Sequence, residues 1–402
     1  MKTGPATRLS VGGPPLGDGE FPVGVGVGSD DPEPSSPQAE DSVARRRGQR
    51  SRSIDRRTCQ VSYKASVCGN EPVLPPRALL YSPAMRAAPI ALVLLSALLA
   101  ACSSGNDDLP STISTGAKPW GVALDAERGR LYTANEGEGT VSIIDLDKRE
   151  AIDIVAVGSG PSSIAVNRET GLVYVTNAFT NTVDVIDPEA AEVVATVTVG
   201  AKPWAITLDE TANRIYVANA DGDSVSVIDG EANTVIDTLS GIDEPWGLEL
   251  SPDAAELYVS AAAEGQLLVF DLESGTVTGR FDVEDRPRGL ALDAAAGLVY
   301  VANAEAGTVS VVDLEAGTAI ASIPVESVPY AVALDTELGR AYVANSFSAT
   351  VSVIDTATNQ VIESVPVAAN PWDLTVGPDG TLYVACSGAS QVVVLTTDDL
   401  GG

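Results

Sequence analysis

Four tryptophans occur in this chain of 402 residues, and each directly follows a proline. With the residues at corresponding positions they form a series spaced 42 residues apart: Trp120, Ser162, Trp204, Trp246, Arg288, Tyr330 and Trp372. Aromatic rings stack on flat or apolar ligands, and a guanidinium pairs with an anionic group. If the side chains converge, they predict a binding surface for a sugar, a peptide or an apolar ligand. The other interpretation is that each ring wedges between neighbouring structural units.

Other residue types limit the chemistry that this chain can perform. It has no histidine, so the commonest general base and the usual ligand of zinc and haem iron are absent. The formal net charge of −31 disfavours nucleic acid as a partner, because phosphate contacts need a basic surface. Asp221 and Asp223 lack the spacing of a calcium loop, which indicates turn residues. We predict no catalytic residue, no metal ligand and no cofactor.

The four cysteines show no paired spacing. They stand at positions 59, 68, 102 and 386, which predicts neither a disulfide framework nor a zinc site. Cys386 takes the place of an asparagine that recurs elsewhere in the chain. Without a histidine to activate it, we interpret this thiol as a buried structural residue.

The spacing of 42 residues indicates a repeat architecture. One copy contains four β-rich segments, at 120–125, 130–135, 140–145 and 151–158, with turn-forming residues between them. Four short strands at this period describe the blade of a propeller. The sequence therefore predicts an all-β, seven-bladed β-propeller with four antiparallel strands in each blade.

Recurring tetrapeptides support this fold. "YVTN" stands at 174–177, and "YVAN" at 216–219, 300–303 and 342–345. On these motifs the chain resembles the YVTN β-propeller family, including its YncE-like group, over 111–397. Members of that family have different roles, so the resemblance implies the fold and no single activity. Asparagines and aspartates that end strands recur in most copies, which indicates turn formation and not catalysis.

The seventh copy ends before its fourth strand. Residues 111–116 align with a fourth strand, although the first three strands of a blade do not precede them. We predict that this strand closes the ring by pairing with 392–396, because that pairing removes two open sheet edges.

Counting strands places the residue after each proline near one mouth of the central channel. Loops that emerge on the same face carry Phe179 and Phe347. The candidate ligand-binding residues are therefore Trp120, Trp204, Trp246, Arg288, Tyr330, Trp372, Phe179 and Phe347. We expect alanine at Trp204 or Trp246 to cost the least stability among the four tryptophans.

The region before the repeats divides into three parts. Residues 1–84 are rich in Gly, Pro, Ser and Arg, which predicts disorder. Because a signal peptide cannot act behind such a tail, the one that begins at Met85 predicts that 1–84 are an over-extended gene start. Residues 85–101 have the pattern of a signal peptide, and "LAAC" at 99–102 resembles a bacterial lipobox. This resemblance implies lipidation of Cys102, a tether at 102–110 and a propeller at 111–402.

Together these features predict a lipid-anchored binding or assembly scaffold of the bacterial cell envelope. The lipid would hold it in the outer membrane, facing the periplasm or the cell surface. Its partner at the channel mouth would be a protein, a glycan or a small molecule, and the protein would be monomeric. The alternative is an envelope hydrolase of the propeller lactonase type.

Overall fold

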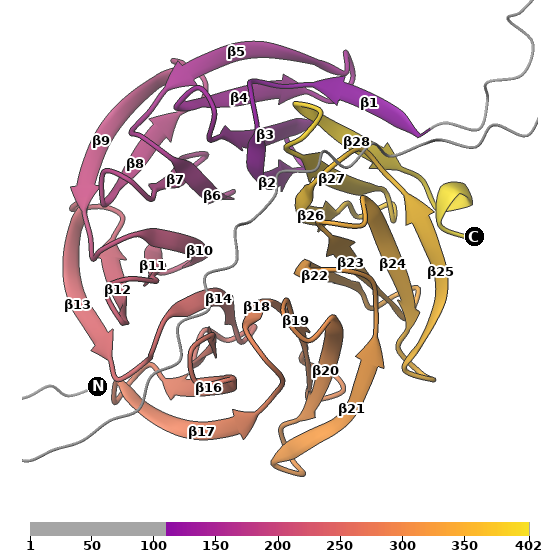
Figure 1. Ribbon diagram of the computed structural model, residues 1–402. Helices are drawn as coiled ribbons and strands as arrows, with labels where there is room; N and C mark the ends of the chain where they lie inside the picture. The colour runs from indigo at the N-terminus through magenta and orange to yellow at the C-terminus, as the bar shows by residue number, and fades with distance from the viewer. Residues whose placement is uncertain (1–109, 402) are drawn as a thin grey trace, which may run out of the picture. The chain divides into compact units, whose positions relative to one another are not determined.

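The structure, a computed structural model, describes residues 110–401. These residues form 28 strands and one short 3-10 helix, η1 (Asp398–Leu400). The strands make seven four-stranded antiparallel sheets, which stand as blades around a central channel (Figure 1). The predicted seven-bladed β-propeller is confirmed. No helix within 110–401 has both the length and the apolar character needed to cross a membrane.

Each blade has one strand in each of four concentric positions. The innermost strands are β2 (Pro119–Asp125), β6 (Pro161–Val166), β10 (Pro203–Asp209), β14 (Pro245–Leu250), β18 (Pro287–Asp293), β22 (Pro329–Asp335) and β26 (Pro371–Val376). The second strands are β3 (Arg130–Asn135), β7 (Val173–Asn177), β11 (Arg214–Asn219), β15 (Glu256–Ala261), β19 (Leu298–Asn303), β23 (Arg340–Asn345) and β27 (Leu382–Cys386). The third strands are β4 (Thr140–Asp145), β8 (Thr182–Asp187), β12 (Ser224–Asp229), β16 (Gln266–Asp271), β20 (Thr308–Asp313), β24 (Thr350–Asp355) and β28 (Gln391–Leu395). The outermost strands are β5 (Glu150–Ala156), β9 (Glu192–Thr198), β13 (Thr234–Ser240), β17 (Thr276–Asp282), β21 (Thr318–Pro324), β25 (Gln360–Pro366) and β1 (Ser111–Ser114).

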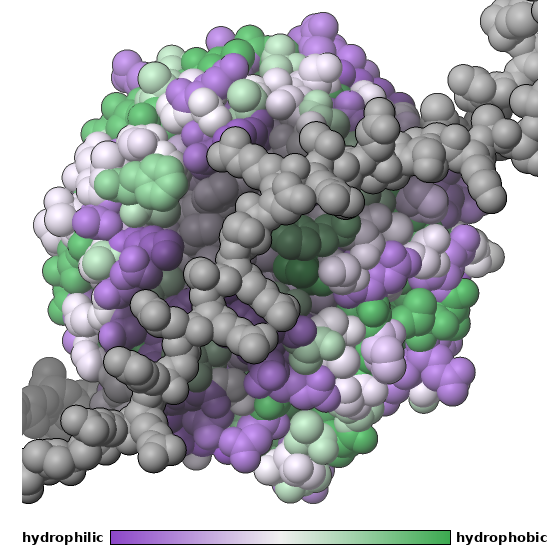
Figure 2. Space-filling model, in the orientation of Figure 1, coloured by the Kyte–Doolittle hydropathy of each residue, from purple (hydrophilic) through white to green (hydrophobic). Residues whose placement is uncertain are grey.

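The hydrophobic core lies between adjacent blades. In one cluster, Tyr132 and Val141 of the first blade pack with Val175 of the second, and all three are fully or almost fully buried. Burying a large apolar side chain contributes about 1.5–3 kcal/mol, so these seams hold the ring together. The outermost strands instead expose apolar residues such as Ile154 and Ile362. Figure 2 shows apolar and hydrophilic residues interspersed around the ring.

The recurring asparagines and aspartates have structural tasks. Asn135 Nδ2 donates hydrogen bonds to Thr140 Oγ1 at 3.1 Å and to Ser142 Oγ at 2.9 Å. Equivalent bonds fix the turns after Asn177, Asn219, Asn303 and Asn345. Asp145 Oδ1 accepts the Lys148 backbone N–H at 3.0 Å, and this bond is the main cause that lowers the pKa of Asp145. The predicted role in turns is confirmed.

Strand β1 completes the last blade. It pairs antiparallel with β28, so that Ile113 lies opposite Val392. Ile113 is 1% exposed and packs with Val122 and Val394. The predicted ring closure is therefore confirmed, with a strand that ends at Ser114 and not at residue 116. The predictions for 1–84, for 85–101, for lipidated Cys102 and for its tether up to residue 109 lie outside the described residues.

Candidate functional site

A repeated backbone feature places one side chain of every blade at the channel mouth. The residue before each proline has a positive φ, between 52° and 69°. The proline has no N–H, and the pairing of the innermost strand with the second strand shifts register directly after it. In the first blade the shift falls between Pro119 and Gly121, which leaves Trp120 unpaired. The bulge therefore releases the intervening side chain toward the channel.

The five aromatic rings of this series pack against one another. Ring centroids lie 5.1 Å apart for Trp120 and Trp372, 4.1 Å for Tyr330 and Trp372, and 4.2 Å for Trp204 and Trp246. Trp204 also lies 6.4 Å from Trp372, on the far side of the ring of blades. We call these residues and Arg288 the aromatic cluster. The expectation that each ring wedges between blades is wrong, because the bulge turns the rings into the channel mouth.

Arg288 stacks on the aromatic cluster. Its Cζ lies 3.4 Å from the centroid of the Trp246 ring and 5.5 Å from that of Tyr330. Within residues 110–401 its Nε and Nη1 atoms are buried without a hydrogen-bond partner, and no carboxylate forms an ion pair with it. Burial lowers the pKa of Arg288, but the guanidinium stays charged at neutral pH. By contrast, the neighbouring Arg286 forms ion pairs with Glu244 and Glu305.

A groove leads from the rim of this mouth to the aromatic cluster. It has a volume of about 510 Å³, and Arg288, Tyr330 and Ser327 are among its lining residues. Ser162 is the one residue of the series outside the aromatic cluster; it is buried and forms hydrogen bonds with Thr176 and with the Pro203 carbonyl. The site is thus an aromatic surface with one cation, reached from the rim.

The two predicted phenylalanines do not join the aromatic cluster. Phe179 and Phe347 are 61% and 74% exposed and lie in loops between second and third strands. Phe179 packs close to Gly160, in the loop that enters β6. They belong to the rim of the same mouth, because their loops lie beside the residues that precede the prolines. Their place among the candidate ligand-binding residues stays a prediction.

Comparison with known proteins agrees with this architecture. A family model described as a YNCE-like β-propeller matches residues 99–214 and 172–273. This chain is a seven-bladed β-propeller with a YNCE-like domain. A model of the NHL repeat matches 369–395, in the last blade.

One solved structure illustrates how widely the fold of this YNCE-like propeller is shared. A chain of the Kuenenia stuttgartiensis hydrazine synthase structure is 20% identical, with a TM-score of 0.63. The match covers 74% of this chain and 98% of that chain. At this identity the likeness concerns the fold alone. No curated protein matches the chain.

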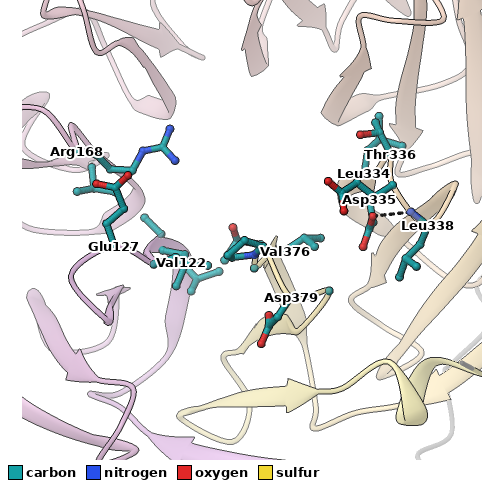
Figure 3. Close-up of a pocket in the computed structure, with 18 of the residues that line it drawn as sticks. Val122, Glu127, Arg168, Leu334, Asp335, Thr336, Leu338, Val376 and Asp379 are labelled. Atoms are coloured by element: carbon teal, nitrogen blue, oxygen red, sulfur yellow. Dashed lines mark hydrogen bonds between the residues drawn. The ribbon is translucent and has the colours of Figure 1, made fainter.

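The opposite mouth of the YNCE-like propeller has a different character. A cavity of about 890 Å³ opens there, lined by the ends of the innermost strands and the turns that follow them. Figure 3 shows Glu127, Asp335 and Asp379 around it, with Arg168 on the side of Glu127. Arg168 forms an ion pair with Glu210. Glu127, Asp335 and Asp379 form no ion pair with Arg168, so this mouth keeps a negative charge.

Sequence reasoning missed two carboxylates inside the channel, Glu249 on β14 and Asp373 on β26. Both line an inner cavity of about 380 Å³. Burial raises the pKa of Glu249 to about 7 and that of Asp373 to about 6. A comparison of the seven copies at two and four residues beyond the proline would have found them, because the other blades carry small uncharged residues there.

Cys386 is fully buried, as predicted. Burial raises the pKa of its thiol to about 12, so it is protonated at neutral pH. It packs with Leu374 and Val393 in the core of the last blade. The thiol therefore serves as a small apolar core residue.

Proposed function

We propose that this YNCE-like propeller is a binding protein of the bacterial cell envelope that recognises an anionic ligand at the aromatic cluster. The observation that carries the proposal is Arg288, whose guanidinium stacks on aromatic rings and, within residues 110–401, forms no ion pair and leaves two buried nitrogen atoms without a hydrogen-bond partner, although Glu305 lines the same groove. A ligand that combines an anionic group with a flat apolar face would complement both features. An acidic sugar or an aromatic carboxylate has this combination.

The four tryptophans give a direct test, because every tryptophan of the chain lies in the aromatic cluster. We expect benzoate or glucuronate to change tryptophan fluorescence, while neutral benzamide and glucose do not. Arg288→Gln should weaken binding about 10- to 100-fold, since a hydrogen bond to a charged group contributes about 1.5–3 kcal/mol.

Arg168→Gln is the matched control, because it removes the same charge at the opposite mouth. It should leave the titration unchanged. If neither anion alters the fluorescence of the wild type, or if Arg288→Gln titrates like the wild type, the aromatic cluster has no ligand of this class.

We also propose that a lipid on Cys102 anchors the protein to the outer membrane. The support is the sequence "LAAC" and the serine at position 103, which favours that membrane by resemblance to proteobacterial lipoproteins. Cys102→Ser should leave the propeller folded and shift it from the membrane fraction to the soluble fraction after cell lysis. Retention of Cys102→Ser in the membrane fraction at the wild-type level would contradict the anchor.

The hydrolase alternative of the lactonase type stays a prediction from family resemblance. Within residues 110–401, no group of three or more His, Cys, Asp or Glu side chains could hold a metal ion.

A further inference from the structure

The central channel encloses a chamber below the aromatic cluster. Its volume is about 380 Å³, and it contains Glu249 and Asp373. A smaller cavity of about 100 Å³ lies directly under the rings and shares Asp373 and Gly289 with the chamber. The chamber also shares Leu334 and Thr375 with the large cavity at the opposite mouth. These shared residues show that the cavities follow one another along a single channel. It runs from the aromatic cluster through the chamber to the acidic opposite mouth.

The two carboxylates are exceptions within the repeat. At the position of Glu249 the other six blades carry Ala123, Ala165, Thr207, Ala291, Ala333 and Thr375. At the position of Asp373 they carry Gly121, Ser163, Ala205, Gly247, Gly289 and Ala331. At each of the two positions, the other six blades thus carry a small uncharged residue on the same innermost strand. At each position the innermost strand therefore forms without a carboxylate in six of the seven blades.

The surroundings of the two carboxylates differ. Asp373 accepts hydrogen bonds from the Val122 N–H at 3.0 Å, which ties the last blade to the first, and from the N–H of its own neighbour Leu374 at 2.9 Å. Glu249 makes no side-chain hydrogen bond or ion pair within the described part of the chain. Neither lysine nor arginine lines the chamber. Glu249 is half-buried in a cavity with apolar walls and has no partner there, so a cation or a proton would stabilise its carboxyl group.

We propose that the chamber binds a small organic ammonium ion, held by Glu249 and Asp373 between apolar walls. The ion would enter through the opposite mouth, where Glu127, Asp335 and Asp379 attract positive charge. Leu248 and Leu290 line the chamber and would contact methylene or methyl groups. This site is separate from the aromatic cluster, so its failure would leave the proposed function unaffected.

The lining favours an organic cation over a metal ion. Calcium takes six to eight oxygen ligands, whereas two carboxylates among aliphatic side chains offer few. No cluster of three or more metal-ligating side chains exists in residues 110–401. An ammonium ion needs fewer polar partners, and its carbon atoms suit apolar walls.

Choline, tetramethylammonium and putrescine are suitable probes, with sodium chloride of equal ionic strength as the control. We expect at least one of them to raise the melting temperature of the full chain at about pH 8. The increase should shrink strongly at about pH 5.5, because both carboxylates take up protons as the pH falls below their raised pKa values of about 7 and about 6.

Two substitutions of Glu249 sharpen the test. Glu249→Gln keeps the shape of the side chain, and Glu249→Ala gives this blade the residue found in four others. Either should weaken ammonium binding about 10- to 100-fold at about pH 8. Glu315→Gln, on an exposed turn, should bind as the wild type does. The proposal is overturned if no probe stabilises the wild type, or if the Glu249 variants respond to the probes as the wild type does.

A measurement without ligand checks the state of Glu249. Its pKa is raised in the folded protein, so folding favours the protonated form. The contribution of Glu249 to the free energy of unfolding is therefore greatest below the ordinary pKa of glutamate and is lost as the pH rises through about 7. The melting temperature of Glu249→Gln should fall less over this range, with a residual slope from Asp373. Equal slopes for the two proteins would show that Glu249 does not lie unpaired in the chamber.

Discussion

Ile113→Asp is expected to lower the melting temperature of the propeller by roughly 5–8 °C, because it breaks the seam that closes the ring. Ile113 is 1% exposed and packs against Val122 and Val394. The substitution removes this burial and places a charge in the core, at a combined cost of about 3–5 kcal/mol. Thermal unfolding followed by circular dichroism measures the effect.

Thr112→Asp is the control for this seam. Thr112 lies on the same strand and is exposed, so the same carboxylate should change the free energy of unfolding by only about 0.5 kcal/mol. If Ile113→Asp had the same melting temperature as Thr112→Asp and the wild type, strand β1 would not close the ring. The outcome matters because each of the seven blades packs against two neighbours only when the first and last blades are joined.

Trp246→Ala is expected to destabilise the protein by about 3–5 kcal/mol, more than alanine at any other tryptophan. Trp246 is 7% exposed, stacks under Arg288 and lies 4.2 Å from the ring of Trp204. Its Nε1 also donates a hydrogen bond to Glu244 at 3.0 Å. From sequence, alanine at Trp204 or Trp246 is expected to cost the least of the four; the burial of the Trp246 ring under Arg288 reverses that order for this residue.

Trp120→Ala serves as the comparison within the aromatic cluster. Trp120 is only partly buried and contacts Trp204 and Trp372 at centroid distances above 5 Å. Urea unfolding should give it a smaller loss of stability than Trp246→Ala. A loss for Trp246→Ala equal to or below that for Trp120→Ala would show that the stacking on Arg288 adds nothing measurable.

The repeat spacing was sufficient to predict the blades and their closure. Each blade buries its strands against the next, so the same residue types recur at every seam, and the orphan strand at 111–114 carried the signature of a missing fourth strand. The predicted series of residues after the prolines does meet at one mouth. Strand counting was enough to predict which mouth the rings occupy, because a proline begins the innermost strand in every copy.

The direction of those rings could not be predicted. The alternation along 120–124 suggested that Trp120 shares a face with Val122 and Leu124, but the register shift after Pro119 breaks the alternation at its first residue. Phe179 and Phe347 were assigned by loop position alone, which does not fix whether a side chain turns inward. Glu249 and Asp373 stand 124 positions apart, and only the closed ring brings them to one chamber.

The most direct test of ligand recognition at the aromatic cluster is an experimental structure of the propeller in complex with benzoate or glucuronate. We predict that the carboxylate of the ligand lies within hydrogen-bond distance of the Arg288 guanidinium and that its ring or sugar face contacts Tyr330 or one of the tryptophans. A ligand that occupies another surface while the aromatic cluster stays empty at saturating concentration would contradict the account.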